Sequence, residues 1–331
     1  MQPLRFEPIL KRIRWGGRRL GSVLGKSLGA GTDYAESWEL VDHGDDQSIV
    51  CDGEYAGWSL ARLVQERGAD LFGSRSSRRQ FPLLLKFLDA QDHLSVQVHP
   101  NDTQARTYDP RENGKTEAWV ILDALPDSRI FAGLRPGVDR ETLQRAIAAG
   151  TVEECLHSFP ARAGDCVFVP AGTVHALGAG VLLAEVQQAS DLTFRLYDWG
   201  RVGTDGRPRQ LHIEQSLACI DFSRGPVAPV HPEPIESGGV TIERLVECPY
   251  FSIRRYQGAN AWSVPREDAF RVLMCVDGEA SLKSAAGREP LCKGDTVLVP
   301  ASADDIAVEP TGEVVVLEIR EGTFLPSPEV S

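Results

Sequence analysis

Polar side chains that could bind a metal ion alternate with apolar ones along residues 93–100 (HLSVQVHP). The apolar residues stand at 94, 96 and 98, and the residues between them are His93, Ser95, Gln97 and His99. On a strand these two sets face opposite sides. An exposed face usually carries Lys, Glu and Thr, so two histidines with a serine and a glutamine indicate the lining of a polar cavity. Gln97 and His99 would lie about 7 Å apart on that face, at a rise of about 3.3 Å per residue, close enough to share one ion.

Two further residues complete a candidate ligand set. Glu117 comes just before an apolar strand within residues 114–119 (GKTEAW), and His175 follows the segment 164–171 (GDCVFVPA). Two histidines, one carboxylate and one amide oxygen suit Zn²⁺, and also suit Fe²⁺ or Mn²⁺. Taken singly, each histidine is better explained as a hydrogen-bonded structural residue. Taken together on one-faced strands, four residues favour a metal site: Gln97, His99, Glu117 and His175.

A cationic side chain is expected to point inward from residues 183–198 (LAEVQQASDLTFRLYD). Two strands flank a Ser-Asp turn here, and Glu185 lies on the first of them. On the second, Arg195 stands between a phenylalanine and a leucine, a poor place for a solvated edge. One interpretation is a structural pair between arginine and glutamate. The favoured interpretation is a cationic clamp for a carboxylate or phosphate.

The composition excludes several classes of function. The chain has 331 residues, with 35 basic and 47 acidic side chains and a formal charge of −12. Such a surface repels nucleic acid and anionic lipid, so we expect neither as a partner. No stretch approaches the roughly 18 apolar residues that a membrane span needs. Hydrophobic residues at 42% and charged residues at 25% are typical of a folded globular protein.

The cysteines and the N-terminal segment both point to the cytoplasm. Seven cysteines form an odd count without a CxxC pair, which favours reduced thiols over disulfides or a zinc knuckle. Six basic residues fall within the first 19, but Glu7, two prolines and a Trp-Gly-Gly segment fit a transit peptide poorly. We expect this segment to be an ordered part of a cytoplasmic protein.

Helix signals are few and lie mostly in the N-terminal half. Residues 57–72 space Leu60, Leu63 and Val64 for one buried face. Residues 139–150 begin with a candidate N-cap aspartate and end on a glycine, and residues 151–154 then match a capping box that opens a second short helix. Almost everything after residue 160 consists of short β-type runs broken by Gly, Pro, Asp and Asn, which predicts barrel or sandwich sheets.

An internal repeat indicates two copies of one β-unit. Residues 164–171 (GDCVFVPA) recur as 294–301 (GDTVLVPA), with six of eight positions identical at an offset of 130. Four prolines within residues 226–234 mark a linker between the copies. The sequence therefore predicts a metal-binding domain over 1–225 with short helical segments, and a related domain over 226–331.

The second copy lacks the ligands of the first. At the same offset the counterpart of His175 is Asp305, and no histidine follows His231. Only the first copy is therefore expected to hold a metal.

The segments that carry these residues resemble the type I mannose-6-phosphate isomerases in their short bacterial form. The resemblance covers about the first 215 residues, and the C-terminal third matches only in general character. The matching segments are PLRFEPIL (3–10), RWGG (14–17), AESWEL (35–40), LLKFLDAQDHLSVQVHPND (84–102), GKTEAW (114–119), VPAGTVHALG (169–178) and QQASDLTFRLYDWGR (187–201).

The resemblance implies a mainly β fold of two cupin-type jelly-roll barrels and one Zn²⁺ per chain. The zinc ligands that it implies are Gln97, His99, Glu117 and His175. It also implies that Arg195 is the catalytic arginine and that further residues line the cavity: Ser95, Lys86, Lys115 and Glu185.

The function implied is the interconversion of D-mannose 6-phosphate and D-fructose 6-phosphate through a cis-enediol. The reaction needs stabilisation of the enediolate charge and a base that moves one proton between C1 and C2. Glu185 is our first choice for the base and Lys115 the second, while Arg195 would either anchor the phosphate or stabilise the enediolate. The alternatives are an Fe(II) or Mn(II) cupin oxygenase and a non-catalytic sugar-binding barrel. The expected partner is a hexose 6-phosphate, and the chain could be a monomer or a homodimer.

Overall fold

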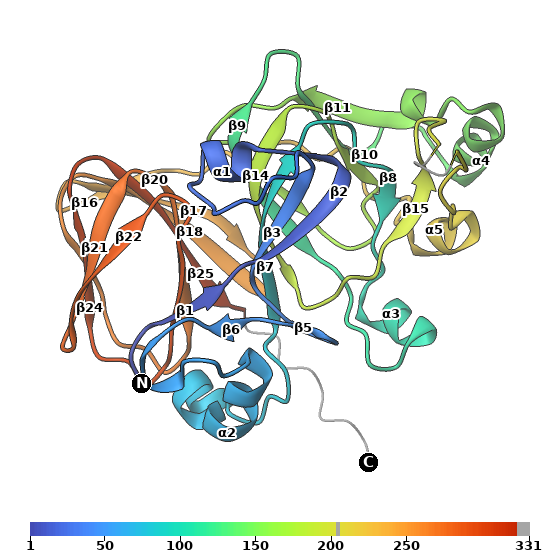
Figure 1. Cartoon of the computed structure of the whole chain (residues 1–331). Helices are drawn as coiled ribbons and strands as arrows, with labels where there is room; N and C mark the ends of the chain where they lie inside the picture. Colours follow the sequence, from blue (N-terminus) through green and yellow to red (C-terminus); the bar gives the residue numbers. More distant parts are fainter. Residues whose placement is uncertain (203–205, 323–331) are drawn as a thin grey trace.

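Four β-sheets stack as layers in the computed structural model of the chain, which describes residues 1–202 and 206–322 (Figure 1). The layers form two sandwiches, and their strands pair antiparallel throughout the described residues. The first sandwich contains β2, β3 and β7–β15, and the second contains β1, β6 and β16–β25. The mainly β fold expected from the sequence is therefore confirmed.

The first sandwich consists of a six-stranded and a five-stranded sheet. The six-stranded sheet has the order β12 (Cys166–Val169), β9 (Glu117–Ala124), β14 (Val181–Gln188), β7 (Leu83–Ala90), β3 (Tyr34–Leu40) and β2 (Ile9–Gly17). The five-stranded sheet has the order β11 (Leu156–Pro160), β10 (Arg129–Leu134), β13 (His175–Leu177), β8 (Val96–Val98) and β15 (Phe194–Tyr197).

The second sandwich consists of an eight-stranded and a four-stranded sheet. The larger has the order β16 (Ile235–Ser237), β17 (Val240–Glu247), β18 (Phe251–Gly258), β25 (Val314–Glu321), β20 (Arg271–Asp277), β23 (Thr296–Val299), β1 (Leu4–Glu7) and β6 (Ile49–Val50). The smaller has the order β19 (Trp262–Val264), β24 (Ile306–Pro310), β21 (Glu279–Ser284) and β22 (Gly287–Cys292). β4 (Asp42–His43) and β5 (Asp46–Gln47) form a separate hairpin.

The N-terminal segment ties the two sandwiches together. β1 belongs to the second sandwich, where Leu4 lies opposite Leu298, and β2 belongs to the first, where Ile9 lies opposite Trp38. The basic N-terminal segment is thus ordered, as expected. The division at residue 225 stays a prediction, with the addition that β1 and β6 pair with strands beyond it.

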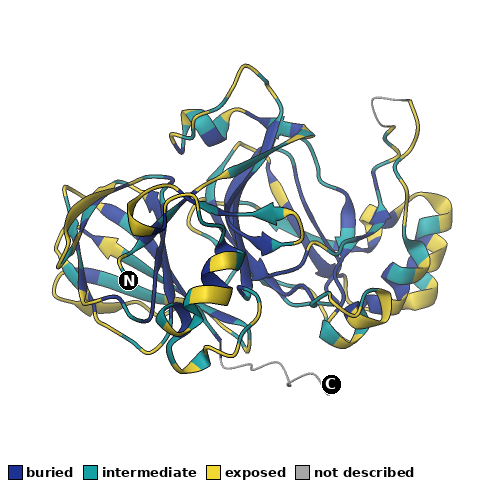
Figure 2. Cartoon of the chain, turned by 60° about the horizontal axis from the view of Figure 1, so that its bottom comes forward, coloured by how far each residue is buried: buried dark blue, intermediate teal, exposed yellow. Residues whose placement is uncertain are grey.

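The six-stranded sheet is covered on both faces, which explains its continuous apolar strands. On β9, Trp119 and Ile121 face the core of the first sandwich, while Ala118 and Val120 face the core shared with the eight-stranded sheet. Figure 2 shows these central strands as buried. Because side chains alternate, every second residue of β7, β9 and β14 points into the interior of the first sandwich.

The repeat has the same backbone pairing in both sandwiches. Gly164 N donates to Ile121 O, as Gly294 N donates to Cys275 O, both at 2.8 Å. Gly164 and Gly294 have φ values of 90° and 91°, a left-handed conformation that favours glycine. The two copies predicted from the sequence are therefore confirmed in three dimensions.

The two longer helices form where the sequence predicted them, although the first begins three residues later than residue 57, and the second begins and ends at its predicted signals. In α2 (Leu60–Phe72) the Ser59 side chain accepts from Arg62 N, and the three predicted apolar residues are buried. In α4 (Arg140–Ala149) the Asp139 side chain accepts from Thr142 N, and Gly150 follows with φ of 73°.

The capping box predicted at residues 151–154 is wrong. The segment forms a 3₁₀ turn, η3 (Val152–Cys155), and the Thr151 side chain makes no capping hydrogen bond. The reason is that Glu154 N, the donor that a capping box would use, donates to the backbone Thr151 O at 3.0 Å.

The remaining helices are short: α1 (Arg19–Ser22), η1 (Gly53–Tyr55), η2 (Gly73–Arg75), α3 (Asp102–Tyr108) and α5 (Ile213–Cys219). α4 and α5 cover the outer face of the five-stranded sheet through a shared apolar cluster (Figure 1). Among the described residues, none of the helices has the length and apolar character to cross a membrane.

Candidate active site

A cavity of about 500 Å³ opens into the first sandwich between β2, β3, β8 and β15. Most of the predicted site residues line it: Lys86, Ser95, Gln97, Lys115, His175, Glu185 and Arg195. His99 and Glu117 are almost completely buried beside it. The structure therefore brings together the four candidate ligands and the other predicted site residues, while His93 does not line the cavity.

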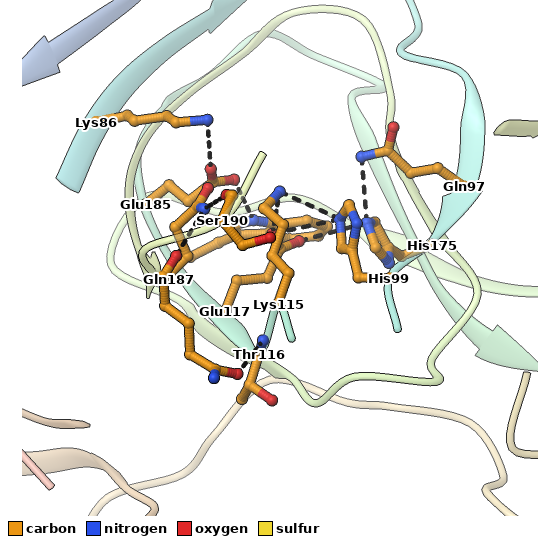
Figure 3. Close-up of polar contacts among 12 residues, drawn as sticks. Lys86, Gln97, His99, Lys115, Thr116, Glu117, His175, Glu185, Gln187 and Ser190 are labelled. Atoms are coloured by element: carbon orange, nitrogen blue, oxygen red, sulfur yellow. Dashed lines mark hydrogen bonds and ion pairs between the residues drawn. The ribbon is translucent and has the colours of Figure 1, made fainter. Parts of the chain in front are cut away.

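His99, Glu117 and His175 form a cluster whose ligand atoms all lie within 4.8 Å of one another. His99 Nε2 is 3.5 Å from Glu117 Oε2, and His175 Nε2 is 3.3 Å from Glu117 Oε1. The amide of Gln97 lies beside this cluster, with its Nε2 at 3.3 Å from His175 Nε2 (Figure 3). Strand pairing creates this proximity, because Gln97 on β8 lies opposite His175 on β13.

The two histidines are held with one ring nitrogen toward Glu117. His99 Nδ1 lies 3.0 Å from Leu192 O and His175 Nδ1 lies 2.9 Å from Thr173 O. Because a carbonyl oxygen only accepts, Nδ1 carries the proton and Nε2 presents its lone pair. Burial lowers the pKa of His175 to about 4 and, together with the Lys115 charge, lowers that of His99. Both rings are therefore neutral near pH 7, as metal binding requires.

Glu117 is the one carboxylic acid of the cluster. Within the described residues, neither of its buried carboxylate oxygens accepts a well-aligned hydrogen bond. Lys115 Nζ lies 2.8 Å from Glu117 Oε2 and 3.2 Å from His99 Nε2. Burial raises the pKa of Glu117, although Lys115 opposes that shift. Two neutral imidazoles beside a carboxylate that lacks well-aligned hydrogen-bond donors suit the binding of a divalent cation.

A second charged group lies across the cavity from the cluster. Glu185 Oε2 accepts a hydrogen bond from Trp119 Nε1 at 2.9 Å, and Glu185 Oε1 lies 3.6 Å from Lys86 Nζ. Lys86 is also 3.5 Å from Glu36. Burial alone would raise the pKa of Glu185, but Lys115 and Lys86 outweigh it and the net shift is downward. Burial alone would lower the pKa of Lys86, but Glu36 and Glu185 raise it. Glu185 is therefore an ionised carboxylate.

Arg195 lies at the β15 side of the cavity. Its Nε donates to Ser95 Oγ at 3.2 Å and its Nη1 to Gln210 O at 2.9 Å. Burial and the nearby Arg209 lower its pKa, while Asp198 opposes that shift. These hydrogen bonds go to neutral oxygens, so the geometry favours a cationic clamp over a pair with glutamate.

One part of the predicted alternating strand is wrong. β8 covers only 96–98, because Asp92 Oδ1 accepts from His93 N and bends the chain before the strand begins. His93 packs against Trp199, with ring centroids 5.0 Å apart, and Leu94 lines the cavity instead of lying with Val96 on the outer face.

Several cavity residues were not identified from the sequence. Lys11, Trp38 and Asp46 also line the cavity, and so does Arg209, whose charge acts on Arg195. Trp119 positions Glu185 by its hydrogen bond. Trp38 and Trp119 lie in the segments AESWEL and GKTEAW. Both could have been predicted to line the cavity, because the alternation along each strand places the tryptophan on its inward face.

The second sandwich carries a cation where the first has its carboxylate. Val169 lies opposite Glu117, and its repeat counterpart Val299 lies opposite Arg271. Arg271 is fully buried, and the exposed Asp305 accepts from Arg266 N. Within residues 1–202 and 206–322, the cluster in the first sandwich is the one group of three metal-binding side chains.

Known proteins share both the sequence and the fold of this chain. Residues 4–127 match the family model of the catalytic domain of type I phosphomannose isomerase, and residues 241–319 match that of the mannose-6-phosphate isomerase cupin domain. Mannose-6-phosphate isomerase ManA of Bacillus subtilis is 37% identical over 95% of this chain and 98% of its own. The mannose-6-phosphate isomerase of Streptococcus mutans is 34% identical over 90% of this chain and 92% of its own.

A solved structure agrees with these matches. The crystal structure of a mannose 6-phosphate isomerase from Bacillus subtilis superimposes with a TM-score of 0.89 and 30% identity, over 96% of this chain and 99% of that one. The expected cupin-type fold is thereby confirmed. This chain belongs to the type I mannose-6-phosphate isomerase family.

Proposed function

We propose that this protein interconverts D-mannose 6-phosphate and D-fructose 6-phosphate. The observation that carries the proposal is a cavity that combines a neutral two-histidine and one-carboxylate cluster with an ionised Glu185 and an inward Arg195. An aldose–ketose isomerisation needs these parts: charge stabilisation beside a carbonyl, a base, and a cation for the phosphate.

We propose Zn²⁺ as the metal, held by Gln97, His99, Glu117 and His175. Three nitrogen and carboxylate donors plus an amide oxygen leave room for a substrate oxygen. When bound, the cation would supply Lewis-acid stabilisation of the charge that develops on the two substrate oxygens. The site would belong to the domain over 1–225, and the domain over 226–331 would lack one.

Glu185 is the proposed base. It would remove the proton from C2 of the aldose and return it to C1, while the hydroxyl proton moves from O2 to O1, giving the ketose. Trp119 would orient the carboxylate, and Lys86 would keep it ionised between turnovers. Lys115 is the less favoured base, because a neutral amine would lose the ion pair with Glu117.

Arg195 is the proposed phosphate anchor. A phosphate carries about −1.5 to −2 charges near pH 7, and Arg209 beside Arg195 supplies a second cation on the same side of the cavity. The Ser95 hydroxyl, 3.2 Å from Arg195 Nε, adds a neutral donor there. This arrangement suits a dianion at the end of the substrate away from the cluster.

The proposed location is the cytoplasm. All seven cysteines are unpaired thiols, and burial raises the pKa of Cys166 to about 12, which makes it unreactive. The proposed partner is the hexose 6-phosphate itself, with the chain as a monomer or homodimer.

A coupled assay tests the proposal. Zinc-loaded protein should convert fructose 6-phosphate to mannose 6-phosphate, a chelator should abolish turnover, and added Zn²⁺ should restore it. Inactivity of protein with one bound zinc per chain would refute the isomerase. Oxygen consumption by the iron-loaded form would favour the oxygenase instead, and sugar phosphate binding without turnover would favour the sugar-binding barrel.

A further inference from the structure

We propose that Tyr250 of the second sandwich and Asp102 are positioning residues for the loop 113–117, which carries Lys115 and Glu117. The second sandwich would thereby set the geometry of a metal site to which it contributes no ligand. This inference rests on the proposed metal site and isomerase function.

Asp102 connects three separate segments through its carboxylate. It begins α3 directly after the His99 segment, and its Oδ1 accepts from Gly114 N at 2.8 Å and from Gln188 Nε2 at 2.9 Å. Its Oδ2 accepts from the Tyr250 hydroxyl at 3.0 Å. The carboxylate therefore joins β14, the loop and the turn before β18.

Gln188 holds the other side of Lys115. Its Oε1 accepts from Thr116 N at 2.9 Å, and its own backbone N donates to Thr116 O at 3.2 Å. Lys115 N donates to Pro100 O at 3.0 Å between these contacts. The backbone of three consecutive residues is thus fixed immediately before Glu117 enters β9.

The fit between the loop and α3 leaves no space for adjustment. A Cβ on Gly114 would lie 2.5 Å from Asp102 N and 2.6 Å from Asn101 C. The two backbones pass in direct contact, so a shift of Asp102 moves the loop with it.

Tyr250 supplies the contact from the second sandwich. It lies in the turn between β17 and β18, where Cys248 N donates to Phe251 O and closes the turn. Burial and Asp102 raise the pKa of Tyr250, so its hydroxyl remains a donor near neutral pH. A deprotonated phenol could not donate this hydrogen bond.

The test compares Tyr250→Phe with Tyr256→Phe. Each substitution removes one hydroxyl of the second sandwich, but the Tyr256 hydroxyl donates to Glu318, away from the loop, also at 3.0 Å. Tyr250→Phe should weaken zinc affinity and lower kcat about five-fold each, the size of one lost hydrogen bond, with KM unchanged. Tyr256→Phe should leave zinc affinity and kcat at wild-type values.

Asp102 variants extend the test. Asp102→Ala should weaken zinc affinity about 10–100-fold, the usual effect of removing support from a ligand. Asp102→Asn should recover most of it, because its oxygen can still accept from Gly114 N and Gln188, and its amide can donate to the Tyr250 hydroxyl. A merely structural role would lower the melting temperature without this recovery in zinc affinity.

Two readouts separate this inference from the isomerase function. Zinc affinity is measured by competition with a chelator, and exchange of the Gly114 and Thr116 amides is measured in zinc-free protein; neither requires turnover. Faster exchange in Tyr250→Phe supports the inference even if the wild type proves inactive. Equal zinc affinity and equal exchange in Tyr250→Phe and Tyr256→Phe would overturn it, and Tyr250→Phe changes too little to prevent folding.

Discussion

Replacing Glu185 by glutamine tests the proton-transfer step most directly. Glutamine has the same shape, and its carbonyl oxygen can still accept the Trp119 hydrogen bond. The Lys86 ion pair at 3.6 Å is lost, but Lys86 keeps Glu36 at 3.5 Å. We therefore expect the variant to fold and retain zinc while it lacks a basic group at this position.

The expected loss of activity follows from the role of Glu185 as a positioned base. A positioned general base contributes about 10²–10⁴-fold, so kcat should fall by that factor, equivalent to about 2.7–5.5 kcal/mol in the activation free energy. KM should change little, because Glu185 lies apart from the proposed phosphate side at Arg195. Loss of one partner of Lys86 should reduce the free energy of unfolding by about 1–3 kcal/mol.

The assay follows both turnover and the proton. Coupled kinetics give kcat and KM, and mannose 6-phosphate deuterated at C2 reports whether proton removal limits the rate. Glu185→Gln should show a larger isotope effect on kcat than the wild type, because its proton step becomes slower. Metal content measured on the same sample excludes zinc loss as the cause.

A matched variant decides between the two candidate bases. Lys115→Met removes the alternative base and leaves Glu185 in place. If Glu185→Gln retained wild-type kcat while zinc-loaded Lys115→Met lost proton transfer, the assignment of Glu185 would be refuted and the base would be Lys115.

Three further predictions concern the remaining groups. His99→Ala and His175→Ala should each lose zinc and activity together; full turnover by a zinc-free variant would contradict the ligand assignment. Arg195→Ala should retain zinc and lower kcat/KM for mannose 6-phosphate by more than 100-fold (about 2.7 kcal/mol), the scale of charged hydrogen bonds to phosphate. Free mannose should be affected much less, and an equal loss for both sugars would make Arg195 an enediolate stabiliser. Arg271→Met should leave kcat unchanged and the free energy of unfolding equal or up to about 4 kcal/mol higher, since a hydrophobic isostere often stabilises such a site; loss of zinc on this substitution would show that the sandwiches do not divide the roles as proposed.

The metal cluster was predictable because it depends on the alternation of side chains along strands. Gln97 and His175 come from strands 78 residues apart in the sequence, yet they lie opposite each other in register. Their inward orientation was predictable because the alternation of side chains in the sequence indicates which face of a strand points into the sandwich. The failure at His93 has a local cause: the Asp92 side chain accepts a hydrogen bond from His93 N, and the strand begins later than the apolar pattern indicates.

Site residues that lie on irregular segments could not be predicted in this way. Arg209 lies beyond β15, and its place in the cavity depends on ion pairs with Asp198 rather than on any strand period. The Tyr250 contact depends on how the two sandwiches pack, which involves segments 148 residues apart. Periodicity describes an element, whereas these contacts depend on the arrangement of several.

The two sandwiches carry opposite charges at the same buried position. Glu117 places a carboxylate beside two neutral imidazoles and Lys115, a group that could bind a cation from outside the chain. Arg271 supplies its own cation at the corresponding place, and Glu318, the counterpart of Glu185 in strand register, lies in the same buried region. Because Arg271 compensates the buried carboxylate of the second sandwich, this sandwich needs no metal ion. Its structure would therefore stay the same whether or not a metal is bound in the first sandwich. The proposed role of Tyr250 requires this, because a second sandwich that became mobile on metal loss could not keep the loop 113–117 in place for the next ion.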